Sequence, residues 1–160
     1  MNTEYKQYPD ESMVWVYQSN RFLKEEEKQH IENKVKSFIA QWESHGSLVK
    51  GTYTLLHDAF VVIFADGEGQ MLCGRAQSAS VALMKELENE LQIPFVDRMN
   101  LSYKVGEQIH FINFNDLKNL YNNGVIQDDS LVFDNTIITK KDFENKWLCA
   151  LENSWHKRYV

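Results

Sequence analysis

The sequence is poor in the residues that mark several protein classes. Its 160 residues include two cysteines, two prolines and seven glycines, so it is neither a disulfide scaffold nor a chain with a long flexible linker. Cys73 and Cys149 lie far apart and match no zinc or CxxC spacing, which is typical of reduced cytoplasmic thiols. A chain of this length buries roughly 70% of its unfolded surface, enough to fold without a disulfide or a metal.

An excess of positive charge and a long apolar run are also missing. Lysine and arginine number 17 against 23 aspartates and glutamates, a net charge of −6, which argues against a nucleic-acid partner. The longest apolar run, residues 59–65, has only the length of a strand, and the N-terminus is polar, unlike a signal peptide. We therefore expect a cytoplasmic protein with no membrane insertion.

The first part of the chain predicts a strand and then a helix. Residues 1–12 are polar and predict a disordered tail, and VWVYQ at 14–18 is rich in the aromatic and β-branched residues of strands. Apolar residues at helical spacing between 24 and 45 predict an amphipathic helix. Gly46 suits the left-handed position that ends such a helix.

A hairpin and a second helix are expected next. Residues 48–56 and 59–65 predict two antiparallel strands joined at His57-Asp58, and the second strand is apolar throughout, as in the centre of a covered sheet. The helix is expected from about Ser78 or Ser80 to Leu91. The resulting order β-α-β-β-α is most of a ferredoxin-like sandwich.

The last third completes the predicted α+β fold. A strand at 108–113 would be the fourth strand of the ferredoxin-like antiparallel sheet, with both helices on one face. Residues 1–107 would then form the core, and 108–160 a small C-terminal α/β lobe packed on it through Trp147 and Trp155. Within the lobe we expect a helix from Asn115 to Gly124, a hairpin at 131–138 and a helix capped by Thr139.

Five segments resemble one group of small bacterial proteins. They are VWVYQ, QWESHG, VDRMNLSYK, VFDNTIITKKDFENKW and SWH, which together span most of the chain between residues 14 and 156. Members of that group often carry the label ABC transporter ATPase. Similar proteins tend to have Gly-Cys-Ser before the second helix, whereas this sequence has Cys73-Gly74-Arg75. The resemblance implies a shared architecture and supplies no activity.

The motif that an ABC ATPase requires is missing from the sequence. That motif, GxxxxGK[ST], holds the nucleotide phosphates with backbone amides and a lysine. The nearest match pairs Gly69 with Gly74, but Arg75 replaces the lysine and Ala76 replaces the magnesium-binding hydroxyl. We therefore expect no nucleotide cofactor of this type, and no other cofactor motif is present.

Cys73 is the candidate nucleophile. A thiol near a helix N-terminus and beside Arg75 is expected to have a lowered pKa, and His57 or His110, or else His45, would have to supply a base. No spacing identifies that base. The alternative interpretation is a buried cysteine that only fills space at the end of a strand.

The same loop offers a candidate anion site. Arg75, Ser78 and Ser80 precede or begin the predicted second helix, where free amides and the helix dipole favour a phosphate or carboxylate. The alternative is that the serines only cap the helix. No metal site is expected, because the histidines and cysteines show no ligand spacing.

Two further pairs are candidate interface residues. Asp97-Arg98 predicts either an internal ion pair or an arginine that grips a carboxylate. Trp155-His156, near the end of the chain, predicts either an aromatic that docks on the body or one that meets a partner.

These features favour a non-enzymatic binding or interaction module whose partner is an unidentified protein or a small anionic ligand. A sheet edge, the cleft between the lobes and the loop at 66–80 are the expected surfaces. An open sheet edge would also allow a homodimer. The alternative function is a cysteine-dependent small-molecule enzyme, or an anion- or nucleotide-binding protein, that uses the loop at 73–80.

Overall fold

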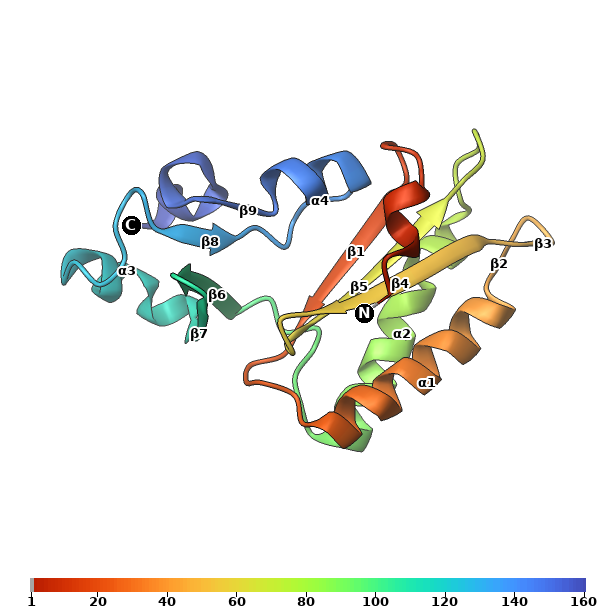
Figure 1. Cartoon of the computed structure of the whole chain (residues 1–160), viewed down its shortest axis with the longest axis horizontal. Coiled ribbons are helices and arrows are strands. Elements are labelled where there is room, and N and C mark those ends of the chain that lie inside the picture. Colours follow the sequence, from red (N-terminus) through yellow and green to blue (C-terminus); the bar gives the residue numbers. More distant parts are fainter. Residues whose placement is uncertain (1) are drawn as a thin grey trace.

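The structure of the protein is a computed structural model that describes residues 2–160. It contains two main antiparallel sheets, of three and four strands, and a separate two-stranded hairpin, with helices around them (Figure 1). In chain order the elements are η1 (Glu4–Gln7), β1 (Met13–Gln18), α1 (Glu25–Gln41), β2 (Glu43–Ser44), β3 (Ser47–Leu48), β4 (Lys50–Leu56), β5 (Phe60–Asp66), α2 (Gly74–Leu91), β6 (Asn100–Val105), β7 (Gln108–Asn113), α3 (Phe114–Asn122), β8 (Leu131–Phe133), α4 (Lys140–Lys146), β9 (Leu148–Ala150), η2 (Leu151–Asn153) and η3 (Trp155–Tyr159). The chain is therefore a mixed α+β protein, as the sequence predicts.

The first sheet has the strand order β1-β5-β4, and all its pairs are antiparallel. The apolar strand β5 lies in the centre, where residues from Phe60 to Ala65 are fully buried because both faces of the sheet are covered. The predicted hairpin forms around His57 and Asp58, both with φ near +55°, values that primed hairpin turns require. Leu56 pairs with Phe60, so the connection also includes Ala59. Helices α1 and α2 cover one face (Figure 1).

The N-terminal segment covers the other face, so the expectation of a disordered tail is not met. Tyr5 in η1 stacks on Phe64 of the central strand with ring centroids 4.5 Å apart, and Tyr8 is 5% exposed. Phe143 of α4 and Trp147 complete this second apolar layer. The segment is polar in composition, but its two buried tyrosines anchor it. Met1 lies outside the described residues.

The ferredoxin-like topology is not confirmed. The order β1-β5-β4 matches its first three strands, but the predicted fourth strand, β7, pairs with β6 in the second sheet. The outer edge of β1 instead contacts the segment before α4. There the N–H of Val14 donates to the carbonyl of Ile138 over 2.9 Å, and Met13 forms an isolated bridge with Thr139.

The second sheet has the order β7-β6-β8-β9. It begins at Asn100, so the C-terminal lobe starts before the boundary predicted at residue 108. The predicted hairpin at 131–138 does not form, because β8 pairs with β6 and β9. The helix capped by Thr139 does form, with the Thr139 hydroxyl accepting the N–H of Asp142 over 3.2 Å.

Helix α1 ends before the predicted position. Its C-cap is Trp42, and His45 and Gly46, with φ of 53° and 78°, form the turn of the short β2–β3 hairpin. Gly46 is therefore a turn residue and not a helix terminator. Within residues 2–160, no helix combines the length and apolarity needed to cross a membrane.

A polar network, partly buried, joins the two lobes. The side-chain oxygen Oε1 of Gln18, at the end of β1, accepts hydrogen bonds from the Ser102 hydroxyl and the Asn135 side-chain amide, each over 2.9 Å. The Asn135 oxygen in turn accepts the indole N–H of Trp147 over 2.9 Å. Trp147 packs on Phe60 of the first sheet, whereas Trp155 packs within the C-terminal lobe. Only the first of the two predicted tryptophan contacts therefore connects the lobes.

Candidate functional sites

Cys73 is the N-cap residue of α2, so this helix starts at Gly74, earlier than predicted. The thiol is partly exposed, and its pKa is lowered to about 7. The backbone N–H of Ala76 in the first helical turn is the largest cause, followed by the Ser44 hydroxyl. The N–H of His45, from the β2–β3 turn, contributes less. This arrangement can stabilise a thiolate.

The histidines proposed to assist Cys73 are placed elsewhere. His57 lies in the turn before β5 and packs against Phe133 and Trp147, whereas Cys73 follows the other end of that strand. A seven-residue strand separates the two by roughly 20 Å. His110 stacks on Tyr103 in the second sheet. Of the histidines considered, only His45 is a neighbour of Cys73.

The three residues of the predicted anion site do not converge. The Ser80 hydroxyl is buried and lies 2.6 Å from that of Tyr17 on β1. The Ser78 hydroxyl donates back to the carbonyls of Gly74 and Arg75 within the same helix. Neither serine caps α2, because the helix begins before both of them. The Arg75 side chain is exposed and forms no ion pair within residues 2–160.

The remaining predicted interface residues form two pairs, one exposed and one docked on the C-terminal lobe. Asp97 and Arg98 are exposed and are not paired with each other; the Asp97 carboxylate accepts the N–H of Met99 over 2.9 Å. Trp155 docks near Phe114, and its ring stacks on His156, which is 1% exposed. In the described part of the chain, no group of three or more histidine, cysteine or acidic residues could hold a metal ion.

Strand β7 has a free edge. The two-residue turn between β6 and β7 makes Val105 and Gln108 a hydrogen-bonded pair, and such pairs alternate along the ladder. The N–H groups of Ile109 and Phe111 therefore point away from β6. The bond from the Phe114 N–H to the Met99 carbonyl, 2.8 Å, agrees with this register. Neither outward N–H has a partner among residues 2–160.

This edge lacks the usual protection against pairing with another chain. Natural edge strands carry lysine, proline, a bulge or an inward-pointing charge. The six residues of β7, QIHFIN, include no proline and no acidic or basic residue other than His110. Phe111, Ile112 and Asn113 are also only partly buried, so apolar strand surface remains accessible at this end.

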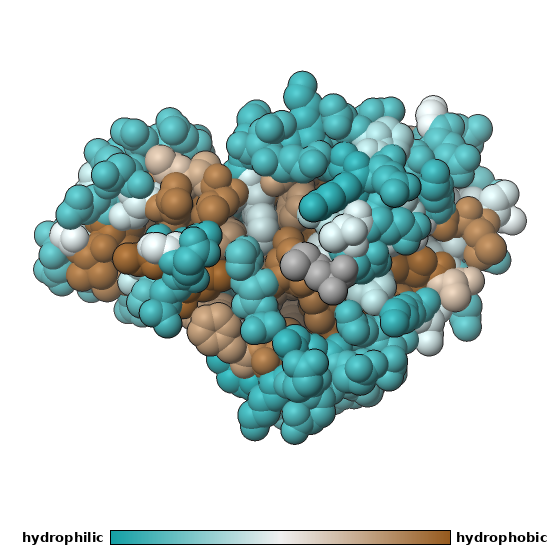
Figure 2. All heavy atoms as spheres, in the orientation of Figure 1, coloured by the Kyte–Doolittle hydropathy of each residue, from teal (hydrophilic) through white to brown (hydrophobic). Residues whose placement is uncertain are grey.

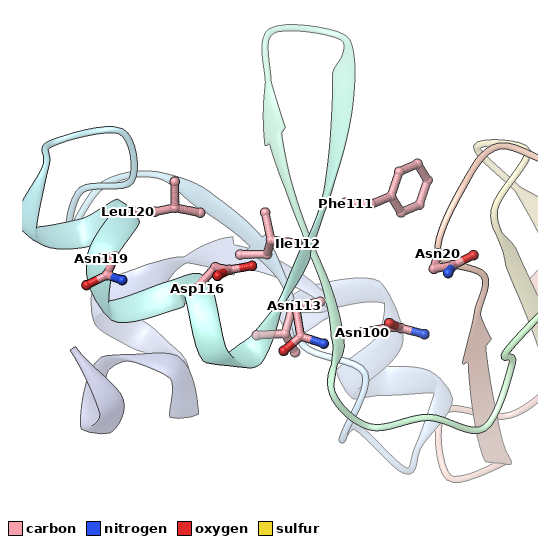
Figure 3. A pocket seen from close by; sticks show the side chains of 9 residues that line it. Asn20, Asn100, Phe111, Ile112, Asn113, Asp116, Asn119 and Leu120 are labelled. Atoms are coloured by element: carbon pink, nitrogen blue, oxygen red, sulfur yellow. The ribbon is translucent and has the colours of Figure 1, made fainter.

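A groove of about 580 Å³ runs along the C-terminal half of β7 (Figure 3). Phe111 and Ile112 both line it, although successive strand residues point to opposite faces. The groove therefore straddles the sheet edge. Asp116, Asn119 and Leu120 of α3 line one side, and Asn20 from the loop after β1 faces Phe111 on the other (Figure 3). Asn100 and Asn113 contribute two further amides.

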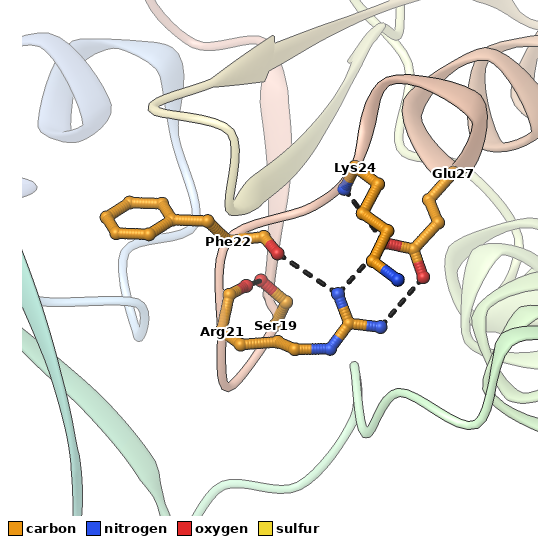
Figure 4. A network of polar contacts seen from close by, with 5 residues as sticks. All are labelled: Ser19, Arg21, Phe22, Lys24 and Glu27. Atoms are coloured by element: carbon orange, nitrogen blue, oxygen red, sulfur yellow. Dashed lines mark hydrogen bonds and ion pairs between the residues drawn. The ribbon is translucent and has the colours of Figure 1, made fainter.

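A bidentate ion pair between Arg21 and Glu27 links the β1–α1 loop, which carries Asn20, to the start of α1 (Figure 4). The Arg21 guanidinium donates to both carboxylate oxygens of Glu27 over 2.9 and 2.7 Å, and to the Phe22 carbonyl over 3.0 Å. Glu27 also accepts the N–H of Lys24 over 2.8 Å at the start of α1. The Phe22 ring then meets Phe111 edge-to-face, with centroids 5.0 Å apart.

The groove holds one carboxylate and no cation. None of its lining residues is basic. Asp116 forms neither an ion pair nor a side-chain hydrogen bond in the described part of the chain. The side-chain amides of Asn20 and Asn119 likewise have no partner among residues 2–160. This lining suits a neutral or cationic polar ligand better than an anion.

This groove was not among the surfaces predicted from the sequence. Its residues come from the β1–α1 loop, from β6 and β7, and from α3. Only the absence of a protecting charge in QIHFIN could have indicated an exposed edge. On the face seen in Figure 2 much of the surface is hydrophilic, and apolar side chains gather over the C-terminal lobe and in the hollow between the lobes.

Comparison with known proteins adds no assignment to either site. No protein-family model matches the chain, and no curated protein or solved structure matches it.

Proposed function

We propose that this protein is a binding module that takes an extended peptide segment along the free edge of β7. The observation that carries the proposal is the unpaired edge itself: the outward N–H groups of Ile109 and Phe111 have no partner among residues 2–160, and Phe111 lines a groove of about 580 Å³. An added strand would satisfy these groups by main-chain hydrogen bonds, and the groove would receive its side chains.

The other strand edges are less suited to this role. Residues next to α4 contact the outer edge of β1. Strand β9 is only three residues long. The N-terminal segment flanks β4: the Asn2 amide donates to the Thr52 hydroxyl over 3.2 Å, and the middle of that strand is buried. Strand β7 combines length, access and an adjoining groove.

The test uses the full chain and peptides that differ only in backbone methylation. Seven-residue peptides would be selected from a random library, and their affinity measured by fluorescence polarisation. The selected peptide would then be N-methylated at each position in turn. Pairing with β7 predicts a loss of tenfold or more at every second position and little change between, because only alternate N–H groups face β7.

Three results would contradict this function. The first is an equal effect of methylation at every position. The second is the absence of any peptide that binds more tightly than 1 mM. The third is a stable dimer in sedimentation analysis that dissociates in the edge variant Phe111→Pro, since a second copy would then occupy β7.

A second candidate function is thiol chemistry at Cys73. The specific observation is a partly exposed thiol whose pKa is lowered to about 7 at the N-terminus of an 18-residue helix. His45 and Ser44 beside it also line a cavity of about 200 Å³. A thiolate in this position could attack an electrophilic small molecule.

Cys149 provides the internal control for this candidate. Burial raises the pKa of the Cys149 thiol. With limiting iodoacetamide, Cys73 should react first, and its rate should reach half its maximum near pH 7. Ser44→Ala should move that midpoint to higher pH, because the Ser44 hydroxyl stabilises the thiolate. A midpoint above pH 8.5, or equal rates at the two cysteines, would exclude an activated thiol.

A further inference from the structure

The side chains around the groove suggest which peptide β7 would bind, provided that the proposed strand pairing is correct. Residues of an added strand alternate between the two faces of the sheet. On one face they would meet α3, where Asp116 and Asn119 line the groove. On the other face they would meet the Phe22–Phe111 pair.

Asp116 is the only charged residue among those that line the groove. It is exposed in the first turn of α3, and no cation of the described chain pairs with it. Lys118, two residues later on the same helix, is not part of the lining. The chain as a whole carries a net charge of −6, which favours approach of a cationic segment and disfavours an anionic one.

We infer that the peptide bound at β7 carries a lysine or arginine that pairs with Asp116, and an apolar residue that packs against the Phe22–Phe111 pair. The two positions are adjacent or an odd number of residues apart, because they face opposite sides of the sheet. The amides of Asn20 and Asn119 are free to bond to the neighbouring polar groups.

Helix stabilisation is the competing explanation of Asp116. A carboxylate in the first turn interacts favourably with the helix dipole. This interaction alone would explain an aspartate at position 116. The unpaired carboxylate is nevertheless directed into the groove (Figure 3). The two explanations differ in one respect: only the pairing explanation makes peptide affinity depend on charge.

The experiment uses three synthetic seven-residue peptides, Val-Thr-Val-X-Val-Thr-Val, in which X is lysine, norleucine or glutamate and the valines face the opposite side of the sheet. Lysine and norleucine have similar length and apolar stems, so their difference isolates the charge. Affinities for the full chain would be measured by fluorescence polarisation at 0.05 and 0.5 M NaCl. The matched variants are Asp116→Asn and Asp129→Asn, which change net charge equally, but Asp129 lies outside the groove.

The lysine peptide should bind about fivefold more tightly than the norleucine peptide at low salt, as a partly exposed ion pair allows. Glutamate should weaken binding, and high salt should reduce both differences. Asp116→Asn should abolish the preference for lysine, whereas Asp129→Asn should retain it. Equal affinity of lysine and norleucine peptides for the unmodified chain would overturn the inference and leave strand pairing intact. Failure of all three peptides to bind would overturn both.

Discussion

His156 should make the folded protein sensitive to mild acid. Its ring is 1% exposed and stacks on Trp155. Its Nδ1 lies 2.8 Å from the Ser154 hydroxyl, and its Nε2 is buried without a partner among residues 2–160. Burial lowers the pKa of His156 to about 4, and the Asp134 carboxylate opposes this shift only in part.

The size of the effect follows from the two pKa values. An ordinary histidine has a pKa of 6.5 and His156 in the folded chain about 4, so at about 1.4 kcal/mol per pKa unit the limit is about 3 kcal/mol. The unfolded chain binds the proton at higher pH than the folded chain does. The contribution of neutral His156 to the free energy of unfolding is therefore fully present above about pH 6.5 and is lost as the pH falls toward 4.

The assay is urea unfolding followed by tryptophan fluorescence at intervals between pH 7.5 and 4.5. His156→Gln removes the titrating group. Its free energy of unfolding should therefore fall less between pH 7.5 and 4.5 than that of the unmodified chain, even if it is lower at pH 7.5. His110→Gln, at an exposed position of β7, is the control and should keep the pH dependence of the unmodified chain. Carboxylates titrate equally in all three proteins and cancel. Equal pH dependence in the unmodified chain and His156→Gln would refute the reasoning.

Three other substitutions and one control substitution test the packing. Tyr5→Ala should lower the free energy of unfolding by about 3 kcal/mol, because it removes a buried aromatic ring; a change below 1 kcal/mol in urea unfolding would mean that the N-terminal segment is loose. Ser80→Ala should cost about 1–2 kcal/mol by leaving a buried tyrosine hydroxyl unpaired, whereas Ser78→Ala on the exposed face should change stability little. Trp147→Phe should cost about 1–3 kcal/mol, since the amide oxygen of Asn135 loses its indole partner, and guanidinium unfolding would measure it.

Elements with strong local signals were predictable from the sequence. The strand at 14–18, the hairpin around His57 and the helix capped by Thr139 all form. In each case the signal is confined to a few neighbouring residues: β-branched and aromatic side chains, a short connection, or a capping hydroxyl. Strand β6 was not predicted, although the sequence contains a strand signal there. Leu101, Tyr103 and Val105 alternate with polar residues, and Gly106 follows in a turn.

Features that depend on distant contacts were not predictable. The start of α2 was expected at a serine, but its N-cap is Cys73, which makes no side-chain capping hydrogen bond. The N-terminal segment looked disordered because nothing in its composition shows that Tyr5 would stack on Phe64. The groove was equally hidden, since Asn20 and Asp116 are almost a hundred residues apart and meet only through the packing of the two lobes.

The division of the strands into two sheets explains why β7 is exposed. In a single four-stranded sheet this strand would lie beside β1, and its apolar residues would be covered. Here the segment around Ile138 and Thr139 occupies the edge of β1, and the network at Gln18 fixes the second sheet beside the first. The same contacts place Asn20 and Phe22 opposite β7, so the packing that displaces β7 from the first sheet also builds the groove along its free edge.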